Sequence, residues 1–342
     1  MRFWNREREI SELLSYLKSE PNSILFVYGP RSCGKTTLLL KMLEQLPPSF
    51  FTYFYDLRDI YIGSVEDFVR YLFAGKESAL SALSGVKLRL SFFEVSLGDL
   101  REALSNKVNL FPMIREKLQK NASVSPEARN LLVFDELQKL KNLYINGDRL
   151  FISELFNFFV RLTKVLHLSH VIVSTSDTFF IEEIYTESLL EGCAEYYKVD
   201  YFSRELAKEV LIAEGMSEQE AEYVVSWCGG VPWFLERVLR KREIMGFKKA
   251  IEGLYSTVKG RVREALGRVY DELGREGKER ALSLLERSLD GTVISDEERN
   301  IARKLVTLEV LYYDPVSGEV SPLTPLHVRA VEELLAGRGE RA

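Results

Sequence analysis

The stretch "GPRSCGKTT", residues 29–37, decides the fold. It places Gly29 and Gly34 five residues apart and follows them with Lys35 and two threonines. Glycines let a loop curl so that successive N–H groups point inward at phosphate oxygens. A helix that begins near Lys35 adds its N-terminal partial positive charge at the same spot. The pattern therefore predicts a loop that holds nucleotide phosphates, with Lys35 on the β- and γ-phosphates.

The residues on either side of this loop fit the same interpretation. "SILFVY", residues 23–28, is a short apolar run typical of a strand that is buried on both faces. "LLLKMLEQL", residues 38–46, continues a helix that two prolines close. A chance glycine loop between a strand and a helix is the alternative, and the acidic strand end described next disfavours it.

A second motif, "LLVFDE" at residues 131–136, is an apolar run that ends in two acids. Asp135 is placed to orient a magnesium ion together with the Thr36 hydroxyl. Glu136 is placed to polarise an attacking water as a general base. Two strand-end carboxylates facing solvent are the alternative when this motif is taken alone. The pair also disfavours a small-molecule kinase, which needs an acceptor site of its own.

Strand-like and helical segments alternate through the first 200 residues. This alternation predicts an α/β fold, a P-loop parallel sheet with helices on both faces. Ligands of such sheets bind beyond the carboxyl ends of the strands, where the glycine loop and Asp135 fall. The other predicted strands are 51–57, 171–177 and 194–202; helices are predicted at 65–85, 97–106 and 110–120, with a strand or hairpin at 86–95.

The strand signals largely stop after residue 200. Residues 203–275 are predicted to form short helices, including 203–215 and 217–230. "EVLYYDPVSGEVSPLTP", residues 309–325, is typical of a β-hairpin. We therefore expect a P-loop ATPase domain (1–202), an all-α lid (203–278) and a C-terminal winged helix (279–342).

Composition limits the classes of protein. The chain has 342 residues, 46% of them apolar and 28% charged, which is typical of a soluble globular protein. The N-terminus lacks the apolar run of a signal peptide, and no apolar stretch reaches the roughly 18 residues needed to span a bilayer. Cys33, Cys193 and Cys228 are too sparse for a disulfide framework. We expect a cytoplasmic protein with no membrane partner.

Two further motifs complete a resemblance to a known family. "FWNREREI" at residues 3–10 and "CGGVPWFL" at residues 228–235 are similar, with the loop and the acidic strand, to the motifs of the archaeal ATPase family. This family is a branch of the signalling P-loop ATPases related to AAA+ proteins. The resemblance implies that Asn5 and Arg6 lie near adenine and sugar and that Pro232 closes over the base. A helix cap at Asn5 and a helix break at Pro232 are the plain alternatives.

The predicted site follows from the motifs and the resemblance together. Magnesium is assigned to Thr36 and Asp135, and catalysis to Lys35 and Glu136 with a strand-end hydroxyl sensing the γ-phosphate. Ser174 and Thr175 are the candidates for that hydroxyl, and Ser176 is a third. The residues expected to bind ATP or ADP are Asn5, Arg6, Gly29, Pro30, Arg31, Ser32, Cys33, Gly34, Lys35, Thr36, Thr37 and Pro232.

One departure from related signalling ATPases bears on the rate. They often carry an arginine just after the strand of the γ-phosphate sensor, where this chain has Ser176 and Asp177. Such an arginine is worth roughly 10³ to 10⁵ in rate. Unless Arg31, Arg204 or a neighbouring subunit supplies one, we expect tight nucleotide binding and slow hydrolysis of ATP to ADP and phosphate.

Two functions fit this sequence. The first is a nucleotide-dependent switch that acts on a protein partner or on a second copy of itself. The alternative is a DNA-binding AAA+ ATPase similar to archaeal origin-recognition initiators. The net charge of −5 does not suggest nucleic acid, but residues 240–268 hold nine Lys or Arg and three acids. These residues and the winged helix are the predicted DNA contacts; a solvated helix surface is the plainer interpretation.

Overall fold

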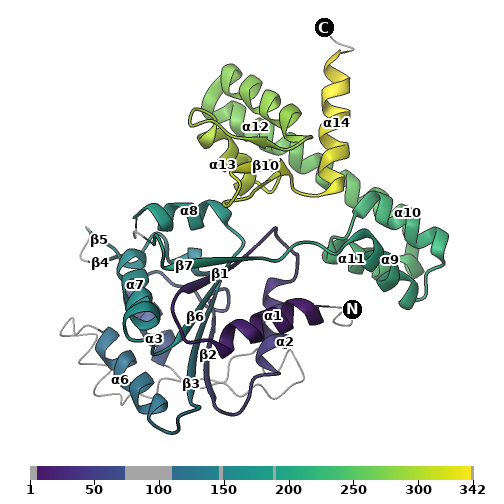
Figure 1. Cartoon of the computed structure of the whole chain (residues 1–342). Helices are drawn as coiled ribbons and strands as arrows, with labels where there is room; N and C mark the ends of the chain where they lie inside the picture. Colours follow the sequence, from purple (N-terminus) through teal and green to yellow (C-terminus); the bar gives the residue numbers. More distant parts are fainter. Residues whose placement is uncertain (1–5, 74–109, 146–148, 188–189, 340–342) are drawn as a thin grey trace.

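The fold is built around a five-stranded parallel sheet. The computed structural model describes residues 6–73, 110–145, 149–187 and 190–339. The strand order is β2-β3-β6-β1-β7, and every neighbouring pair is parallel (Figure 1). The five predicted strands are thus confirmed; their bounds are β1 Ile24–Tyr28, β2 Phe50–Asp56, β3 Arg129–Asp135, β6 His170–Thr175 and β7 Ala194–Lys198.

Helices cover both faces of the sheet because the central strands are apolar on both sides. Phe26 and Val27 are neighbours in β1, and each is fully buried in a different core. Val27 packs with α1 (Glu7–Lys18) and α2 (Lys35–Leu43). Phe26 packs on the opposite face with α3 Val65–Phe73, α6 Leu110–Ala122, α7 Phe151–Val160 and α8 Thr178–Glu187.

Part of the expected pattern lies outside the described residues. This holds for the strand or hairpin at 86–95, the helix at 97–106 and the second half of the helix at 65–85. Between β3 and β6 the chain forms elements that the sequence pattern did not predict. They are a 3-10 turn Leu137–Leu140, a small hairpin of β4 Tyr144–Ile145 and β5 Arg149–Leu150, helix α7, and a π-helical turn Arg161–Val165.

Three helices follow the sheet at the positions expected for the lid. They are α9 (Arg204–Ala213), α10 (Glu218–Cys228) and α11 (Pro232–Met245). Ser203 caps α9, and Ser217 caps α10 in a reciprocal pair with Glu220. These caps satisfy N–H groups at the first turn, which explains why the helices begin where they do.

The prediction of only short helices up to residue 275 is wrong. Helix α12 runs from Phe247 to Ser288, with a break at Gly274, where φ is 67° and ψ is −164°. Gly274 tolerates this backbone because it has no Cβ. Helices of the lid and the C-terminal elements share one hydrophobic core, which includes Val225, Val262 and Val331. The boundary expected at residue 278 falls inside α12, and the domain limits stay predictions.

The C-terminal elements form the expected winged helix. Strands β9 (Leu311–Tyr313) and β10 (Glu319–Pro322) pair antiparallel as the predicted hairpin, and β8 (Thr292–Val293) adds a third strand. Helices α13 (Arg299–Thr307) and α14 (Pro325–Gly339) flank this small sheet. Across the described ranges, no helix combines the length and the apolar character that crossing a bilayer requires.

The winged helix lies against the sheet domain beside α8 and the end of β7 (Figure 1). Phe179 of α8 stacks on Tyr313 of β9, with ring centroids 4.2 Å apart and planes 6° from parallel. Ion pairs surround this stack, so the contact is partly electrostatic. They join Lys198 to Asp314 at 2.9 Å, Arg299 to Glu182, and Arg303 to Glu183.

Candidate functional site

The loop between β1 and α2 depends on its two glycines. Gly29 has φ of +148°, and a Cβ built on it would lie 2.0 Å from the carbonyl oxygen of Val199. Gly34 has φ of +98° and immediately precedes the first residue of α2. Other residues would be strained in both places. The loop can therefore curl tightly against the end of β7 and enter a helix at once.

The N–H groups inside the curl are available to a ligand. Those of Ser32, Cys33 and Gly34 donate to no acceptor within the described part of the chain. The Cys33 side chain points away from solvent, being 1% exposed, and burial raises the pKa of its thiol. Cys33 is thus placed to offer its backbone N–H, as the sequence predicts, rather than a reactive thiolate.

Lys35 is held within the same loop. Its Nζ donates to the carbonyl oxygens of Gly29 and Pro30 at 2.9 and 3.1 Å. The residue is only 6% exposed, so few waters solvate its charge. A buried ammonium that rests on neutral carbonyls gains from an anionic partner, because opposite charges attract strongly where little water screens them. The loop therefore forms a cationic cradle.

Thr36 and Asp135 meet where β3 ends beside the loop. Thr36 Oγ1 donates to Asp135 Oδ2 at 2.6 Å, and Asp135 is completely buried. Its Oδ1 atom has no hydrogen-bond partner among the described residues. Burial raises the pKa of Asp135, and hydrogen bonding from Thr36 opposes that rise. Oδ1 therefore remains able to accept a further hydrogen bond.

This pair of oxygens suits magnesium. Mg²⁺ binds through hydroxyl, carboxylate and phosphate oxygens, commonly with only one or two carboxylates from the protein. Among the described residues, no group of three or more His, Cys, Asp or Glu could hold a metal ion alone. A divalent ion at Thr36 and Asp135 would thus complete its coordination with water or with the phosphates of the nucleotide.

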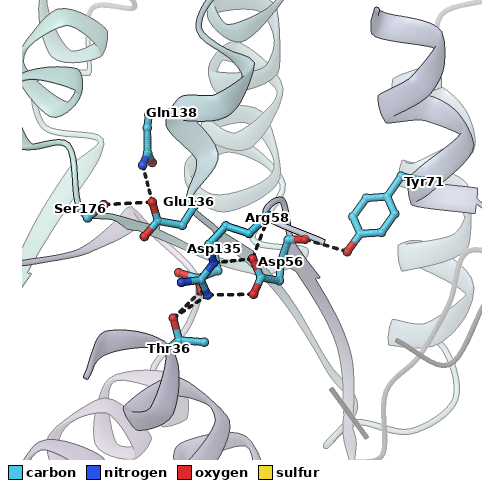
Figure 2. Close-up of polar contacts among 8 residues, drawn as sticks. All are labelled: Thr36, Asp56, Arg58, Tyr71, Asp135, Glu136, Gln138 and Ser176. Atoms are coloured by element: carbon cyan, nitrogen blue, oxygen red, sulfur yellow. Dashed lines mark hydrogen bonds and ion pairs between the residues drawn. The ribbon is translucent and has the colours of Figure 1, made fainter. Parts of the chain in front are cut away.

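Glu136 lies one residue beyond Asp135 and turns the opposite way. Its φ of 60° is in the left-handed region, which starts the 3-10 turn. Ser176 Oγ donates to Glu136 Oε2 at 3.0 Å, and Gln138 Nε2 donates to the same oxygen (Figure 2). The carboxylate is thereby held at the edge of the site, in reach of a water but not directed at the loop by any described contact.

The strand-end hydroxyls have different partners. Ser176 is the one that reaches Glu136. Thr175 Oγ1 donates instead to Gln138 Oε1 at 2.8 Å. Thr175 therefore orients Gln138, which in turn donates to Glu136. The Ser174 hydroxyl is buried without a partner in the described chain. The structure gathers all three near the acidic strand end; which of them senses a phosphate stays a prediction.

The sequence interpretation missed Asp56 and Arg58. Asp56 ends β2 directly beside Asp135, its partner in the parallel register. Arg58 donates to Asp56 through Nε and Nη2, and Nη2 also donates to Asp135 Oδ2 at 2.7 Å and to Thr36 Oγ1 at 3.0 Å (Figure 2). The signal was present: "FTYFYDLRD" is a second apolar strand that ends in an acid.

The remaining predicted site residues are those assigned to the adenine end of the nucleotide. Asn5 lies outside the described residues. Arg6 is buried, donates to the carbonyl oxygens of Cys33 and Asp200 at 3.0 and 2.7 Å, and lies 5.0 Å from the Phe202 ring centroid. It thus ties the phosphate loop to the exit of β7. Pro232 is the first residue of α11.

A cavity of about 220 Å³ lies where the loop, the lid and the winged helix meet. Arg31 and Ser32 line it from the loop, Trp233 and Arg237 from α11, and His327 from α14. Arg31 pairs with Glu309 at the start of the hairpin, and Glu309 also pairs with Arg261 of α12 at 2.7 Å. The other arginine considered from the sequence, Arg204, pairs with Glu222 of the lid.

The strand order, the glycine loop and the acidic strand define a P-loop domain followed by a helical lid and a winged helix. A family described as "ATPase domain predominantly from Archaea" matches residues 3–238. The chain belongs to this archaeal ATPase family, as the sequence motifs predict.

Relatives extend the likeness over the whole chain. A protein of Methanocaldococcus jannaschii, described as an uncharacterized ATP-binding protein, is 33% identical over 98% of this chain and 95% of its own length. One of Pyrococcus abyssi with the same description is 39% identical over 70% of this chain and 73% of its own. The solved structure of a Walker-type ATPase of Pyrococcus abyssi superposes with a TM-score of 0.67 at 20% identity, covering 96% of each chain.

Proposed function

We propose that this chain binds Mg-ATP at residues 29–37 and acts as a nucleotide-dependent switch with slow intrinsic hydrolysis. The observation that carries the proposal is the ion pair between Arg31 of the phosphate loop and Glu309 of the winged helix. A residue at the predicted phosphate site thereby contacts the far end of the chain directly. The description of the relatives as ATP-binding supports the choice of nucleotide.

In this proposal the loop binds the phosphates through main chain and lysine together. The N–H groups of Ser32, Cys33 and Gly34 face the phosphate oxygens, and Lys35 exchanges its two carbonyl partners for them. The N-terminal end of α2 adds favourable potential. The ammonium thus exchanges neutral acceptors for anionic ones, and the attraction between opposite charges makes the exchange favourable.

Thr36 and Asp135 would hold the magnesium ion. Bound there, the ion neutralises charge that develops on the phosphates. Asp135 supplies the negative charge through Oδ2, beside Thr36 Oγ1, and its unpartnered Oδ1 can accept from a water of the metal shell. The Thr36 hydroxyl supplies a neutral oxygen from the first turn of α2.

Glu136 is the proposed general base, and its present partners support a slow rate. Ser176 and Gln138 both donate to it, so these contacts occupy one carboxylate oxygen that a water would otherwise approach. Arg31 and Arg204 are each paired with a glutamate away from the catalytic acids. While both pairs are intact, neither of these arginines contacts the transferring phosphate, and the rate lacks the factor of about 10³ to 10⁵ that such a group supplies.

The switch would work through competition for Arg31. A terminal phosphate near the loop attracts Arg31 and weakens its pair with Glu309, while ADP lacks that phosphate. A ligand shifts an equilibrium only by its differential contacts with the two states. An exposed ion pair is worth up to about 1 kcal/mol, so this contact alone changes the population of a released winged helix about fivefold. The released surface would then meet a protein partner or a second copy of the chain.

Hydrogen exchange tests the proposal. Amides of residues 299–324 are compared with Mg²⁺ and either ADP or a non-hydrolysable ATP analogue. We expect faster exchange with the analogue, and Glu309→Gln should raise exchange with ADP to a similar level. Glu319→Gln is the matched control, because Glu319 lies in the same hairpin and its carboxylate accepts only from Ser317 among the described residues. Identical exchange with both nucleotides would refute the switch.

A further inference from the structure

Arg58 contacts both of the oxygens assigned to magnesium, Thr36 Oγ1 and Asp135 Oδ2. Its Nη2 lies 3.0 Å from Thr36 Oγ1 and 2.7 Å from Asp135 Oδ2 (Figure 2). A magnesium ion requires its ligands at about 2.0 to 2.1 Å in octahedral geometry. The guanidinium and the ion therefore cannot use both oxygens together, since each would fill the space of the other.

The guanidinium is fixed in this place by Asp56. The Asp56 carboxylate accepts from Arg58 Nε at 2.9 Å and from Nη2 at 2.8 Å, and the backbone N–H of Arg58 donates to it as well. Tyr71 donates to the backbone carbonyl of Asp56 at 3.0 Å and holds the strand end (Figure 2). A guanidinium anchored by two donors on one carboxylate keeps its orientation.

Burial explains why a cation is needed there. Asp56 is 5% exposed and Asp135 is completely buried, and they are neighbours across β2 and β3. Two unpaired carboxylates in such a place are strongly unfavourable, because charges lose their hydration and repel each other. Arg58 is the only described lysine or arginine that pairs with either of them.

We propose that Arg58 is a positioning residue that competes with the divalent ion for Thr36 Oγ1 and Asp135 Oδ2. While it stays on Asp56, it can release these two oxygens and remain beside the phosphates. Arg58 thus balances the charge of the acidic pair by itself, and the chain requires less metal to hold a nucleotide. This inference rests on the proposed nucleotide site, but the competition concerns the chain's own residues and is measurable without a nucleotide.

Two effects of opposite sign follow for Arg58→Ala. Without the guanidinium, Thr36 and Asp135 are free, so a divalent ion binds the protein more tightly, by about fivefold for the loss of a competing ion pair. Without metal, the acidic pair repels the phosphates of a nucleotide. The affinity of the variant for a nucleotide, measured in the presence of a chelator, therefore falls by a similar factor. Arg58→Lys retains a charge without the fork that grips Asp56, and we expect smaller shifts of the same sign.

The experiment uses the full chain with Mn²⁺ as the probe. Electron paramagnetic resonance measures free Mn²⁺ in titrations of wild type, Arg58→Ala, Arg58→Lys and Arg8→Ala. Calorimetry then measures ADP binding to the same four proteins in excess chelator. Arg8 is an exposed arginine on α1 that pairs with Glu12 and serves as the control for loss of a charge.

The proposal predicts that Arg58→Ala binds Mn²⁺ more tightly than wild type and binds ADP more weakly in excess chelator. Arg8→Ala should behave like wild type in both measurements. Mn²⁺ binding that is unchanged or weaker in both Arg58 variants would overturn it. If Arg58→Ala does not fold, Arg58→Lys decides by the same criterion. Wild type that binds Mn²⁺ but no nucleotide would refute the proposed function, and the Mn²⁺ comparison would still judge Arg58.

Discussion

The phosphate loop and the basic stretch at 240–268 both concentrate charge, but they use it differently. At the loop, Lys35 rests on backbone carbonyls, and Asp135 has one oxygen without a partner in the described chain. In the basic stretch, glutamates pair with four of the nine cations: Arg240 with Glu236, Arg268 with Glu264, Lys259 with Glu333 and Arg261 with Glu309. The difference teaches that a buried ammonium held only by neutral carbonyls, as Lys35 is, marks a binding site more clearly than a run of basic residues does.

The energetic cost explains the difference. A buried polar atom without a partner costs free energy of folding, roughly 1 to 3 kcal/mol. A chain keeps such an atom where a ligand later satisfies it. Exposed ion pairs, by contrast, contribute only about 0 to 1 kcal/mol and form wherever opposite charges lie within reach. The basic stretch is thus explained by local pairing and by its contacts with α14 and the hairpin.

Lys35→Ala is the strongest test of this contrast. The loop loses its only described lysine, and the phosphates lose their charge-assisted partner. We expect the affinity for Mg-ATP to fall at least about 100-fold, the equivalent of roughly 3 kcal/mol. Fluorescent-nucleotide titration measures it. Lys41→Ala, on the same helix but paired with Glu44, should bind like wild type. Equal affinities of the two variants would contradict the contrast.

Glu136→Gln separates binding from hydrolysis. The amide keeps the size of the carboxylate but cannot accept a proton, so turnover should fall about 100-fold or more while Mg-ATP affinity stays within about twofold. Steady-state phosphate release and the same titration provide the two values. Glu127→Gln, at an exposed carboxylate before β3, is the control. Unchanged phosphate release in Glu136→Gln would remove this residue from the role of base.

The sheet and the loop could be predicted from the sequence because each depends on a local pattern of residues. Short apolar runs predicted all five strands, and the glycine spacing predicted the turn into α2. Arg58 was not predicted, because its role arises only when β2 and β3 become neighbours and bring Asp56 beside Asp135. Strand order is a property of the whole chain and not of either segment.

Helices α7 and α12 and the contact between Arg31 and Glu309 were not predicted, for related reasons. Helix α7 reads "FISELFNFFV" and buries six apolar residues, so its polar residues Ser153, Glu154 and Asn157 form only a narrow stripe. Helix α12 contains glycines at 253, 260 and 267, which lower helix propensity, but packing in the shared core keeps it continuous up to Gly274. The link between Arg31 and Glu309 joins residues 278 apart in sequence.

A buried histidine provides a smaller test, at the opposite end of the sheet from the loop. Burial lowers the pKa of His170 to about 4, against 6.5 for an exposed histidine. Between these values the unfolded chain takes up a proton and the folded chain does not, so stability is complete above about pH 6.5 and falls as the pH drops. At pH 5 the loss from His170 is about 2 kcal/mol.

Urea unfolding at pH 7.5 and pH 5 measures this loss. His170→Phe cannot take up the proton and keeps a ring beside Tyr16, so its stability should fall less between the two values. The pKa of the buried His327 is also lowered to about 4, so the free energy of unfolding of both proteins still falls with pH because of His327. If the stability of His170→Phe and of wild type depends equally on pH, His170 does not cause the loss of stability at low pH.

The basic stretch should give the smallest effect. Lys248 and Lys249 lie at the start of α12, and Lys248 lies over the ring of Tyr223. Replacing both with alanine should change Mg-ATP affinity by less than about twofold, since neither contacts the loop. We also expect no duplex DNA binding at about 50 mM salt. Tight DNA binding that weakens steeply with salt and is lost in this variant would favour the DNA-acting alternative.

A crystal structure with Mg²⁺ and a non-hydrolysable ATP analogue tests the central claim most directly. The account predicts phosphate oxygens within hydrogen-bond distance of Lys35 Nζ and of the N–H groups of Ser32, Cys33 and Gly34, with the metal on Thr36 Oγ1. Phosphates bound elsewhere, or a loop whose N–H groups point away from the bound analogue, would contradict it.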